Sequence, residues 1–266
     1  MALRRVEAII LGGRDLGEAD RVLSLFTKEE GRFGAVAKGV RRGRSRLAPI
    51  LDPLGQVSLM LYAGRSLDRI TSATALRNWR RVREDLVRLA VGSYAAELFD
   101  LGLPEREPET AAYALLVGFL EELGAFPDPE LLLLGLEFRF LDLLGYRPEL
   151  EICVRCGAAL GPTLGFDAEG GGVVCGVCCR RGEEISGAAR QVMRHFLAEP
   201  RRSLHSLRLG GPIRRELRRL LGDSWLVRLG RSPRSTGFLQ EVLGTGTGLT
   251  TQGRSANLKP DEEREE

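Results

Sequence analysis

All five cysteines of the 266-residue chain fall in one stretch, from Cys153 to Cys179. Four of them form two C-x-x-C pairs, Cys153 with Cys156 and Cys175 with Cys178, and 18 residues separate the pairs. Two residues between cysteines allow a tight turn to aim both thiolates at one ion, and two such turns complete a tetrahedron. This spacing is typical of four-cysteine zinc sites. The sequence therefore predicts one structural Zn²⁺ ion bound by these four thiolates.

Disulfides, a redox-active pair and ordinary buried cysteines are the alternatives to a metal, and ordinary buried cysteines do not cluster in one stretch in this way. Disulfides need an oxidising compartment, and nothing in the sequence indicates export. A redox pair would open a helix after a strand, and it would leave the second pair unexplained. Cys179 remains an alternative to Cys178 as the fourth ligand, although Cys178 completes the two-residue spacing. Gly170–Gly172 predicts a hairpin turn between two short strands, as in a zinc ribbon. A closed four-thiolate site has no open coordination position, so we expect it to stabilise the fold and not to catalyse a reaction.

Residues 3–75 are predicted to form the domain that would bind a ligand. They contain five short, glycine-punctuated strands, the pattern of an OB-type β-barrel, whose face and loops commonly bind oligonucleotides. The loop between the third and fourth strands carries five cations within nine positions: Lys38, Arg41, Arg42, Arg44 and Arg46. Such a loop can be a solvated hairpin tip. On a small barrel, however, this density of positive charge favours contacts to nucleic-acid phosphates.

The formal net charge of +3 conceals three regions of opposite sign. Residues 1–80 hold 15 Lys and Arg against 8 Asp and Glu, residues 97–151 hold 3 against 13, and residues 190–234 hold 12 against 3. Basic regions of this kind suit a polyanionic partner. No segment has the ~18 apolar residues of a membrane span, and the apolar run near the start is too short for a signal peptide. We therefore expect a cytoplasmic protein.

Most of the rest of the chain is predicted to be helical. Apolar residues at three- and four-residue steps indicate one helix from Asn78 to Gly102, a second from Pro108 and a third from Pro129. Four consecutive leucines, Leu131–Leu134, place the third helix at the centre of a bundle. After the cysteines, Ser186 is expected to cap a helix that Pro200 ends.

The last predicted helix supplies a second set of candidate DNA-binding residues. Its polar face is almost wholly arginine: Arg214, Arg215, Arg218 and Arg219. These residues either cover a face of the bundle or contact a phosphate backbone, and the sequence leaves both possibilities open. The polar and finally acidic residues 244–266 are expected to be disordered.

The predicted fold class is α+β and multidomain, with an N-terminal OB-type β-barrel, a helical bundle and an inserted four-cysteine zinc ribbon. The expected division has five parts: an OB-fold nucleic-acid-binding domain (1–78), the first part of a helical domain (79–150), a zinc-binding module (151–182), the second part of the helical domain (183–243) and a disordered tail (244–266).

Catalytic patterns are absent from the sequence. His195 and His205 lie in neither an H-x-E nor an H-E-x-x-H pattern, and there is no Walker A loop or G-x-S-x-G elbow. The sequence nominates no nucleophile, so we expect a protein that is not an enzyme.

Four stretches, in order, carry a resemblance to a known family. They are DLGEADRVLSLFTKEEGRFGAVAKGVRRGRSRLAPILDP (15–53), GYRPELEICVRCG (145–157), VVCGVCC (173–179) and, more weakly, RRELRRLLGDSWLVRLGRSPRSTGFL (214–239). In these stretches the chain resembles the RecO family of bacterial DNA repair and recombination mediators. The resemblance implies an OB domain, a helical domain and an inserted zinc module. It also implies binding of single- and double-stranded DNA at the nucleoid, annealing of complementary strands, and action with RecR to load RecA onto DNA coated by single-strand-binding protein (SSB).

Two other functions stay open on the residues alone. One is an adaptor whose barrel and zinc ribbon bind RNA or RNA polymerase, and it would prefer RNA and would not anneal strands. The other is a metal-dependent nucleic-acid enzyme, whose turnover would be lost on chelation without unfolding.

Overall fold

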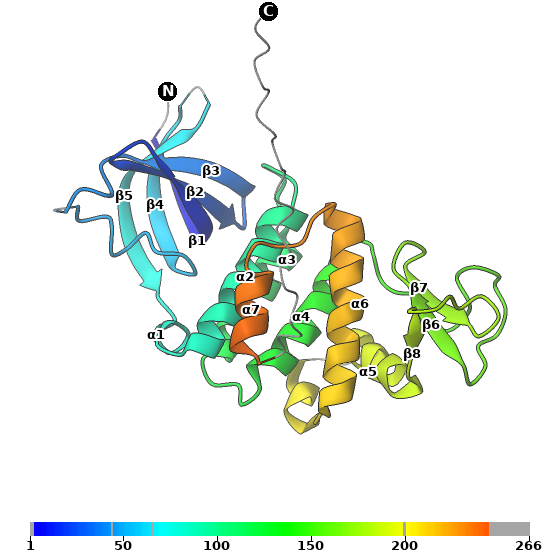
Figure 1. Ribbon diagram of the computed structural model, residues 1–266. Coiled ribbons are helices and arrows are strands. Elements are labelled where there is room, and N and C mark those ends of the chain that lie inside the picture. Colours follow the sequence, from blue (N-terminus) through cyan, green and yellow to red (C-terminus); the bar gives the residue numbers. More distant parts are fainter. Residues whose placement is uncertain (1–2, 44, 65, 199–200, 245–266) are drawn as a thin grey trace, which may run out of the picture.

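The computed structural model describes residues 3–43, 45–64, 66–198 and 201–244. A β-barrel and a small three-stranded module lie on opposite sides of a helical bundle (Figure 1). The chain is thus α+β, as predicted, with the cysteines in the small module.

The barrel consists of the five strands predicted for residues 3–75: β1 (Leu3–Leu16), β2 (Asp20–Thr27), β3 (Gly31–Ala37), β4 (Gln56–Tyr62) and β5 (Asp68–Arg77). They close in the order β1-β2-β3-β5-β4, and the pairing of β3 with β5 is parallel whereas the other pairings are antiparallel. This order is that of an OB-type barrel. Alternating side chains fill its interior, where Ile10, Leu25, Phe33 and Leu59 are fully buried.

The loop from residue 38 to residue 55 closes one end of the barrel. Val40 and Leu51 from this loop are buried in the barrel core. The predicted cationic segment is therefore part of a packed connection, and its apolar residues fix the backbone from which the cations extend.

The bundle contains α1 (Arg80–Arg83), α2 (Leu86–Gly102), α3 (Thr110–Leu123), α4 (Pro129–Leu143), α5 (Gly187–Ala198), the 3₁₀ helix η1 (Arg201–Ser206), α6 (Gly211–Leu229) and α7 (Thr236–Val242). The prediction of a single helix from Asn78 to Gly102 is wrong, because the helical conformation is interrupted between Arg83 and Leu86. The Asp85 carboxylate accepts a hydrogen bond from the backbone N–H of Arg88 at 2.9 Å and so caps a new helix.

Helix α4 lies at the centre of the bundle, as predicted. It packs against α2, α3, α5 and α6, and Leu131–Leu134 are all buried. The rings of Phe99 and Phe140 stack with centroids 3.9 Å apart, and Trp225 lies 5.6 Å from Phe140. Aromatic packing thus joins α2, α4 and α6.

The barrel and the bundle make close contact at Gly31. Its φ of +68° suits glycine, and a Cβ at this position would lie 2.0 Å from the backbone oxygen of Glu107. Next to it, Arg106 from the loop after α2 donates to Asp68 of β5 at 2.8 Å. These contacts fix the barrel against the bundle.

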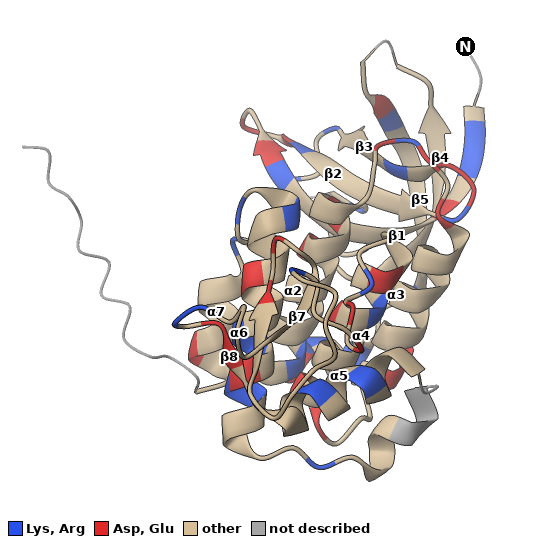
Figure 2. Ribbon diagram, turned by 90° about the vertical axis from the view of Figure 1, so that its right-hand side faces the viewer, with Lys and Arg blue, Asp and Glu red and all other residues tan. Residues whose placement is uncertain are grey.

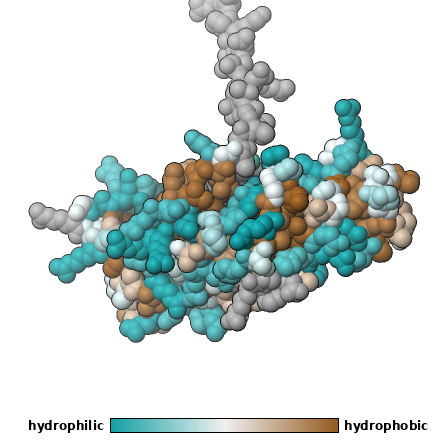
Figure 3. Space-filling view, turned by 90° about the horizontal axis from the view of Figure 1, so that it is seen from below, coloured by the Kyte–Doolittle hydropathy of each residue, from teal (hydrophilic) through white to brown (hydrophobic). Residues whose placement is uncertain are grey.

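Ser186 caps α5 as predicted, since its Oγ accepts a hydrogen bond from the N–H of Ala189 at 3.0 Å. Pro200 and, within the predicted disordered tail 244–266, all residues after Gly244 lie outside the described residues. Within the described part of the chain, the helices are too short or too polar to span a membrane. On the face seen from below, hydrophobic residues form separate patches among hydrophilic ones (Figure 3).

Candidate metal centre and nucleic-acid interface

The small module brings the four predicted metal ligands together. Its strands β6 (Leu164–Asp167), β7 (Gly172–Cys175) and β8 (Glu184–Ile185) form a sheet in the order β7-β6-β8. The predicted turn at Gly170–Gly172 joins β6 to β7. The sulfur atoms of Cys153, Cys156, Cys175 and Cys178 all lie within 4.8 Å of one another. Four thiols in this arrangement could hold a metal ion.

The protonation of these thiols reflects their crowding. Burial opposes ionisation of Cys153, but backbone hydrogen bonds from Cys175, Cys156 and Arg155 outweigh it and lower the pKa to about 6. The hydrogen bond with the Cys156 thiol, together with burial, raises the pKa of Cys178 to about 12. Four thiolates this close repel one another, so a bound cation would replace protons that the metal-free cluster retains.

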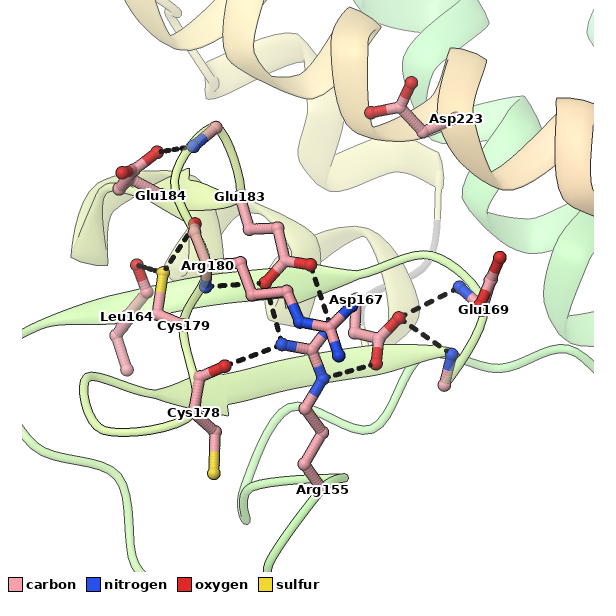
Figure 4. A network of polar contacts seen from close by, with 12 residues as sticks. Arg155, Leu164, Asp167, Glu169, Cys178, Cys179, Arg180, Glu183, Glu184 and Asp223 are labelled. Carbon is pink, nitrogen blue, oxygen red and sulfur yellow. Dashed lines mark hydrogen bonds and ion pairs between the residues drawn. The ribbon is translucent and has the colours of Figure 1, made fainter.

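Cys179 lies outside this cluster. Its sulfur approaches the carbonyl oxygens of Leu164, at 3.9 Å, and Arg180, at 3.5 Å. Figure 4 shows the sulfurs of Cys178 and Cys179 pointing in opposite directions. The structure therefore offers Cys178, and not Cys179, as the fourth ligand.

Arg155, inside the first C-x-x-C turn, connects the parts of the module (Figure 4). Its guanidinium donates to the Asp167 carboxylate at 2.9 Å, to the Glu183 carboxylate at 2.7 and 2.9 Å, and to the carbonyl oxygen of Cys178 at 2.6 Å. The hydrogen bonds from Arg155 lower the pKa of Glu183. Arg155 is not among the predicted site residues, although a lone cation inside a C-x-x-C turn followed by acidic residues is a visible signal in the sequence.

The predicted DNA-binding loop is anchored at its start. Arg41 donates to the carbonyl oxygen of Gly17 at 3.1 Å and forms an ion pair with Asp15 at 3.3 Å. Asp20 accepts a hydrogen bond from the N–H of Gly39 at 2.7 Å. Arg41 is thus partly occupied in holding the loop on the β1–β2 hairpin.

The far end of the same loop is held by α1. Arg83 donates to the Asp52 carboxylate at 3.0 Å and to the carbonyl oxygen of Pro53 at 2.6 Å. Lys38, next to the first anchor, and Arg42 and Arg46, between the two anchors, are exposed. Arg44, the remaining predicted cation, lies outside the described residues. A loop fixed at both ends presents its cations with a smaller loss of conformational entropy on binding.

The arginines of α6 divide into two groups. Arg214 forms ion pairs with Asp128 and Glu130, and Arg218 pairs with Glu130 at 2.8 Å. These two residues therefore cover a face of the bundle, the first of the two predicted alternatives. The ion pairs with Asp128 and Glu130, at the start of α4, favour this alternative for Arg214 and Arg218 over contacts with phosphates.

The other two arginines of α6 differ in their surroundings. Arg219 donates to the carbonyl oxygens of Gly182 at 2.8 Å and Glu184 at 2.9 Å, which connects α6 to the small module. Arg215 is exposed. The acidic and basic regions of the sequence thus meet within the fold, and charges of both signs are interspersed over the helices (Figure 2).

Comparison with known proteins agrees with this architecture. An OB-type barrel, a helical bundle and an inserted four-cysteine module that could hold a metal ion define a multidomain α+β protein. The family "Recombination protein O N terminal" matches residues 1–79, and "Recombination protein O C terminal" matches residues 83–237. The chain belongs to the RecO family, as the sequence resemblance indicated.

Individual relatives match over most of their length. A DNA repair protein RecO of Symbiobacterium thermophilum is 39% identical over 249 residues, which cover 91% of this chain and 98% of the relative. The DNA repair protein RecO of Heliobacterium modesticaldum is 34% identical over 274 residues, which cover 100% of this chain and 98% of the relative. The DNA repair protein RecO of a Roseiflexus species is 37% identical over 242 residues, which cover 90% of this chain and 85% of the relative.

Proposed function

We propose that the protein binds single- and double-stranded DNA and anneals complementary strands in recombinational repair. The observation that carries this proposal is the cationic loop, which is anchored by Arg41 and Arg83 and exposes Lys38, Arg42 and Arg46 on an OB-type barrel. The relatives named DNA repair protein RecO support the same process. The protein would act without chemistry, as a mediator and not as an enzyme.

Annealing would follow from charge neutralisation. Two complementary strands repel each other through their phosphates, and cations that contact both strands lower this repulsion. DNA affinity should then fall with salt, with a log–log slope of about 0.7 per phosphate contact on a single strand and about 0.9 on a duplex. Of the three aromatic residues of the barrel, Phe26 and Phe33 are fully buried and not available to stack on bases, which leaves the exposed Tyr62 of β4. Recognition would therefore rest on the backbone and show little sequence preference.

The partners belong to the same proposal. The family resemblance supports action with RecR, which helps load RecA onto DNA coated by SSB, and docking of SSB on the helical domain. Its DNA substrate would place the protein at the nucleoid.

We infer that the ion of the metal centre is one structural zinc. The sulfurs of Cys156 and Cys175 are 3.8 Å apart. A tetrahedral ion with Zn–S distances of about 2.3 Å requires sulfurs about 3.8 Å apart, so this pair fits zinc. Zinc would supply no reactive ligand position here. It would hold residues 151–182 as a folded insertion between the two parts of the helical domain.

Equilibrium binding tests the nucleic-acid preference. Fluorescence anisotropy should show binding of a labelled single-stranded DNA that weakens with salt, and competition by RNA of equal length should be no stronger than competition by unlabelled DNA. A clear preference for RNA would instead favour the adaptor function.

A further inference from the structure

A hollow of about 340 Å³ lies between the outer face of the barrel and the helical bundle. The barrel lines it with Arg14 of β1, Ser24 of β2 and Arg32 of β3. Asp100 of α2, Glu105 of the loop that follows α2, and Arg234, from the segment between α6 and α7, line it from the bundle. The second and third strands of an OB barrel form the face that usually binds oligonucleotides, so this hollow lies where a strand would pass.

Three arginines from distant parts of the sequence meet at this hollow. Arg14 and Arg234 are exposed, and their backbone positions are fixed by the β1–β2 pairing and by the carboxylate of Glu97, which accepts a hydrogen bond from the N–H of Arg234 at 2.8 Å. Arg32 donates to the carbonyl oxygen of Leu103 at 3.0 Å. Three arginines against the two acidic residues Asp100 and Glu105 leave the hollow with a net positive charge, which suits a phosphate diester.

Asp100 occupies donors that a phosphate would use. Its Oδ1 atom accepts a hydrogen bond from the hydroxyl of Ser24 and lies 3.4 Å from a guanidinium nitrogen of Arg32. A hydroxyl and a guanidinium on the ligand face of the barrel are thus turned toward a carboxylate of the same chain.

We propose that this hollow binds a phosphate of a single nucleic-acid strand through Arg14, Arg32 and Arg234, and that Asp100 competes with that phosphate for Ser24 and Arg32. The inference rests on the proposed DNA-binding function and gives the strand a path. Arg14 precedes Asp15, which pairs with Arg41 of the cationic loop. Because successive side chains of a strand leave opposite faces, a nucleic-acid strand that contacts both sites would cross over the β1–β2 hairpin.

Affinity changes of opposite sign test this proposal. The probe is a fluorescein-labelled 20-nucleotide oligo(dT), titrated with the full chain at several salt concentrations. Arg14→Ala and Arg234→Ala should each weaken binding about three- to tenfold and reduce the salt slope by about 0.7. Asp100→Asn should tighten binding about threefold or more, because it removes a negative charge beside the phosphate. A misfolded protein would not show this gain.

Two matched variants control for net charge. Arg231→Ala removes an exposed arginine from the same segment as Arg234, and Glu169→Gln removes an exposed carboxylate from the distant module. Both should change affinity much less than their counterparts. The inference is overturned if Arg14→Ala and Arg234→Ala bind like Arg231→Ala, or if Asp100→Asn binds no more tightly than Glu169→Gln.

The same titration separates this inference from the proposed function. Loss of binding on joint replacement of Lys38, Arg42 and Arg46, with wild-type affinity in the variants of the hollow, would keep the function and reject the hollow. Absence of oligo(dT) binding by the wild-type chain would reject both.

Discussion

The Glu183 carboxylate accepts two hydrogen bonds from the Arg155 guanidinium, at 2.7 and 2.9 Å. Arg155 lies inside the first cysteine pair and Glu183 follows the second pair, so this bidentate pair joins the two ends of the small module independently of the thiols. Because Arg155 also contacts Asp167 and the backbone of Cys178, it fixes both C-x-x-C turns relative to the sheet.

Replacement of Arg155 should therefore weaken metal retention without removing a ligand. We expect Arg155→Ala to release its metal to a chromogenic chelator about tenfold faster than the wild type, and Arg155→Lys to be intermediate. Arg180→Ala, which removes an exposed arginine from the same module, is the control. Equal release rates for Arg155→Ala and Arg180→Ala would show that the hydrogen bonds of Arg155 do not position the cysteine ligands.

The ligand set itself is testable one cysteine at a time. Wild type and Cys179→Ser should each carry about one zinc per chain, because the Cys179 sulfur points away from the cluster. Serine at position 153, 156, 175 or 178 should lower the zinc content measured by mass spectrometry of the purified protein. Full zinc content in Cys178→Ser, or loss in Cys179→Ser, would contradict the assignment.

Glu137 should make stability depend on pH. This fully buried carboxylate accepts hydrogen bonds from Tyr94 at 3.2 Å and Trp225 at 3.1 Å, and burial raises its pKa from 4.5 to about 7. The folded state thus holds the proton more tightly than the unfolded state. Its contribution is fully present below pH 4.5 and is lost as the pH rises to 7.

Urea unfolding at pH 4.5 and 7.5 measures this effect. Between these pH values the wild type should lose up to about 3 kcal/mol more of its free energy of unfolding than Glu137→Gln, which does not titrate. An equal change in the two proteins would mean that Glu137 is ionised in the fold.

Adjacent arginines on α6 should differ in their effect on stability. Arg214→Ala should lower the free energy of unfolding by about 2 kcal/mol, because it removes the ion-pair partner of Asp128 and leaves Glu130 paired with Arg218 alone. Arg215→Ala should change it by less than about 0.5 kcal/mol, since Arg215 is exposed. Similar urea midpoints for the two variants would argue against a structural role for Arg214.

Local patterns predicted much of this fold. The strand spacing, the hairpin at Gly170–Gly172 and the cysteine pairs depend on residues close in sequence, and the structure contains all three. The break before α2 was missed because the apolar period continues through it, and only the hydrogen bond of the Asp85 carboxylate marks the new start.

Tertiary pairing could not be predicted in the same way. The acidic partners of Arg214 lie 84 and 86 residues away, so the sequence could not distinguish this structural arginine from a DNA-binding one. Likewise, Arg41 and Arg42 are equivalent in a charge count, yet Arg41 anchors the β1–β2 hairpin whereas Arg42 extends from the loop. Asp100 gives no signal in the sequence, because its role follows only from the position of α2 against the barrel.

An annealing assay tests the central claim most directly. Two complementary fluorescent oligonucleotides would be mixed at low and moderate salt with wild type, with a variant carrying Lys38→Ala, Arg42→Ala and Arg46→Ala, or with a control carrying Arg180→Ala, Arg181→Ala and Arg231→Ala. Both variants lose three positive charges. The anchored loop predicts acceleration by wild type and by the control, with at least a tenfold loss in the loop variant and a weaker effect at higher salt. Equal acceleration by wild type and the loop variant would contradict the account.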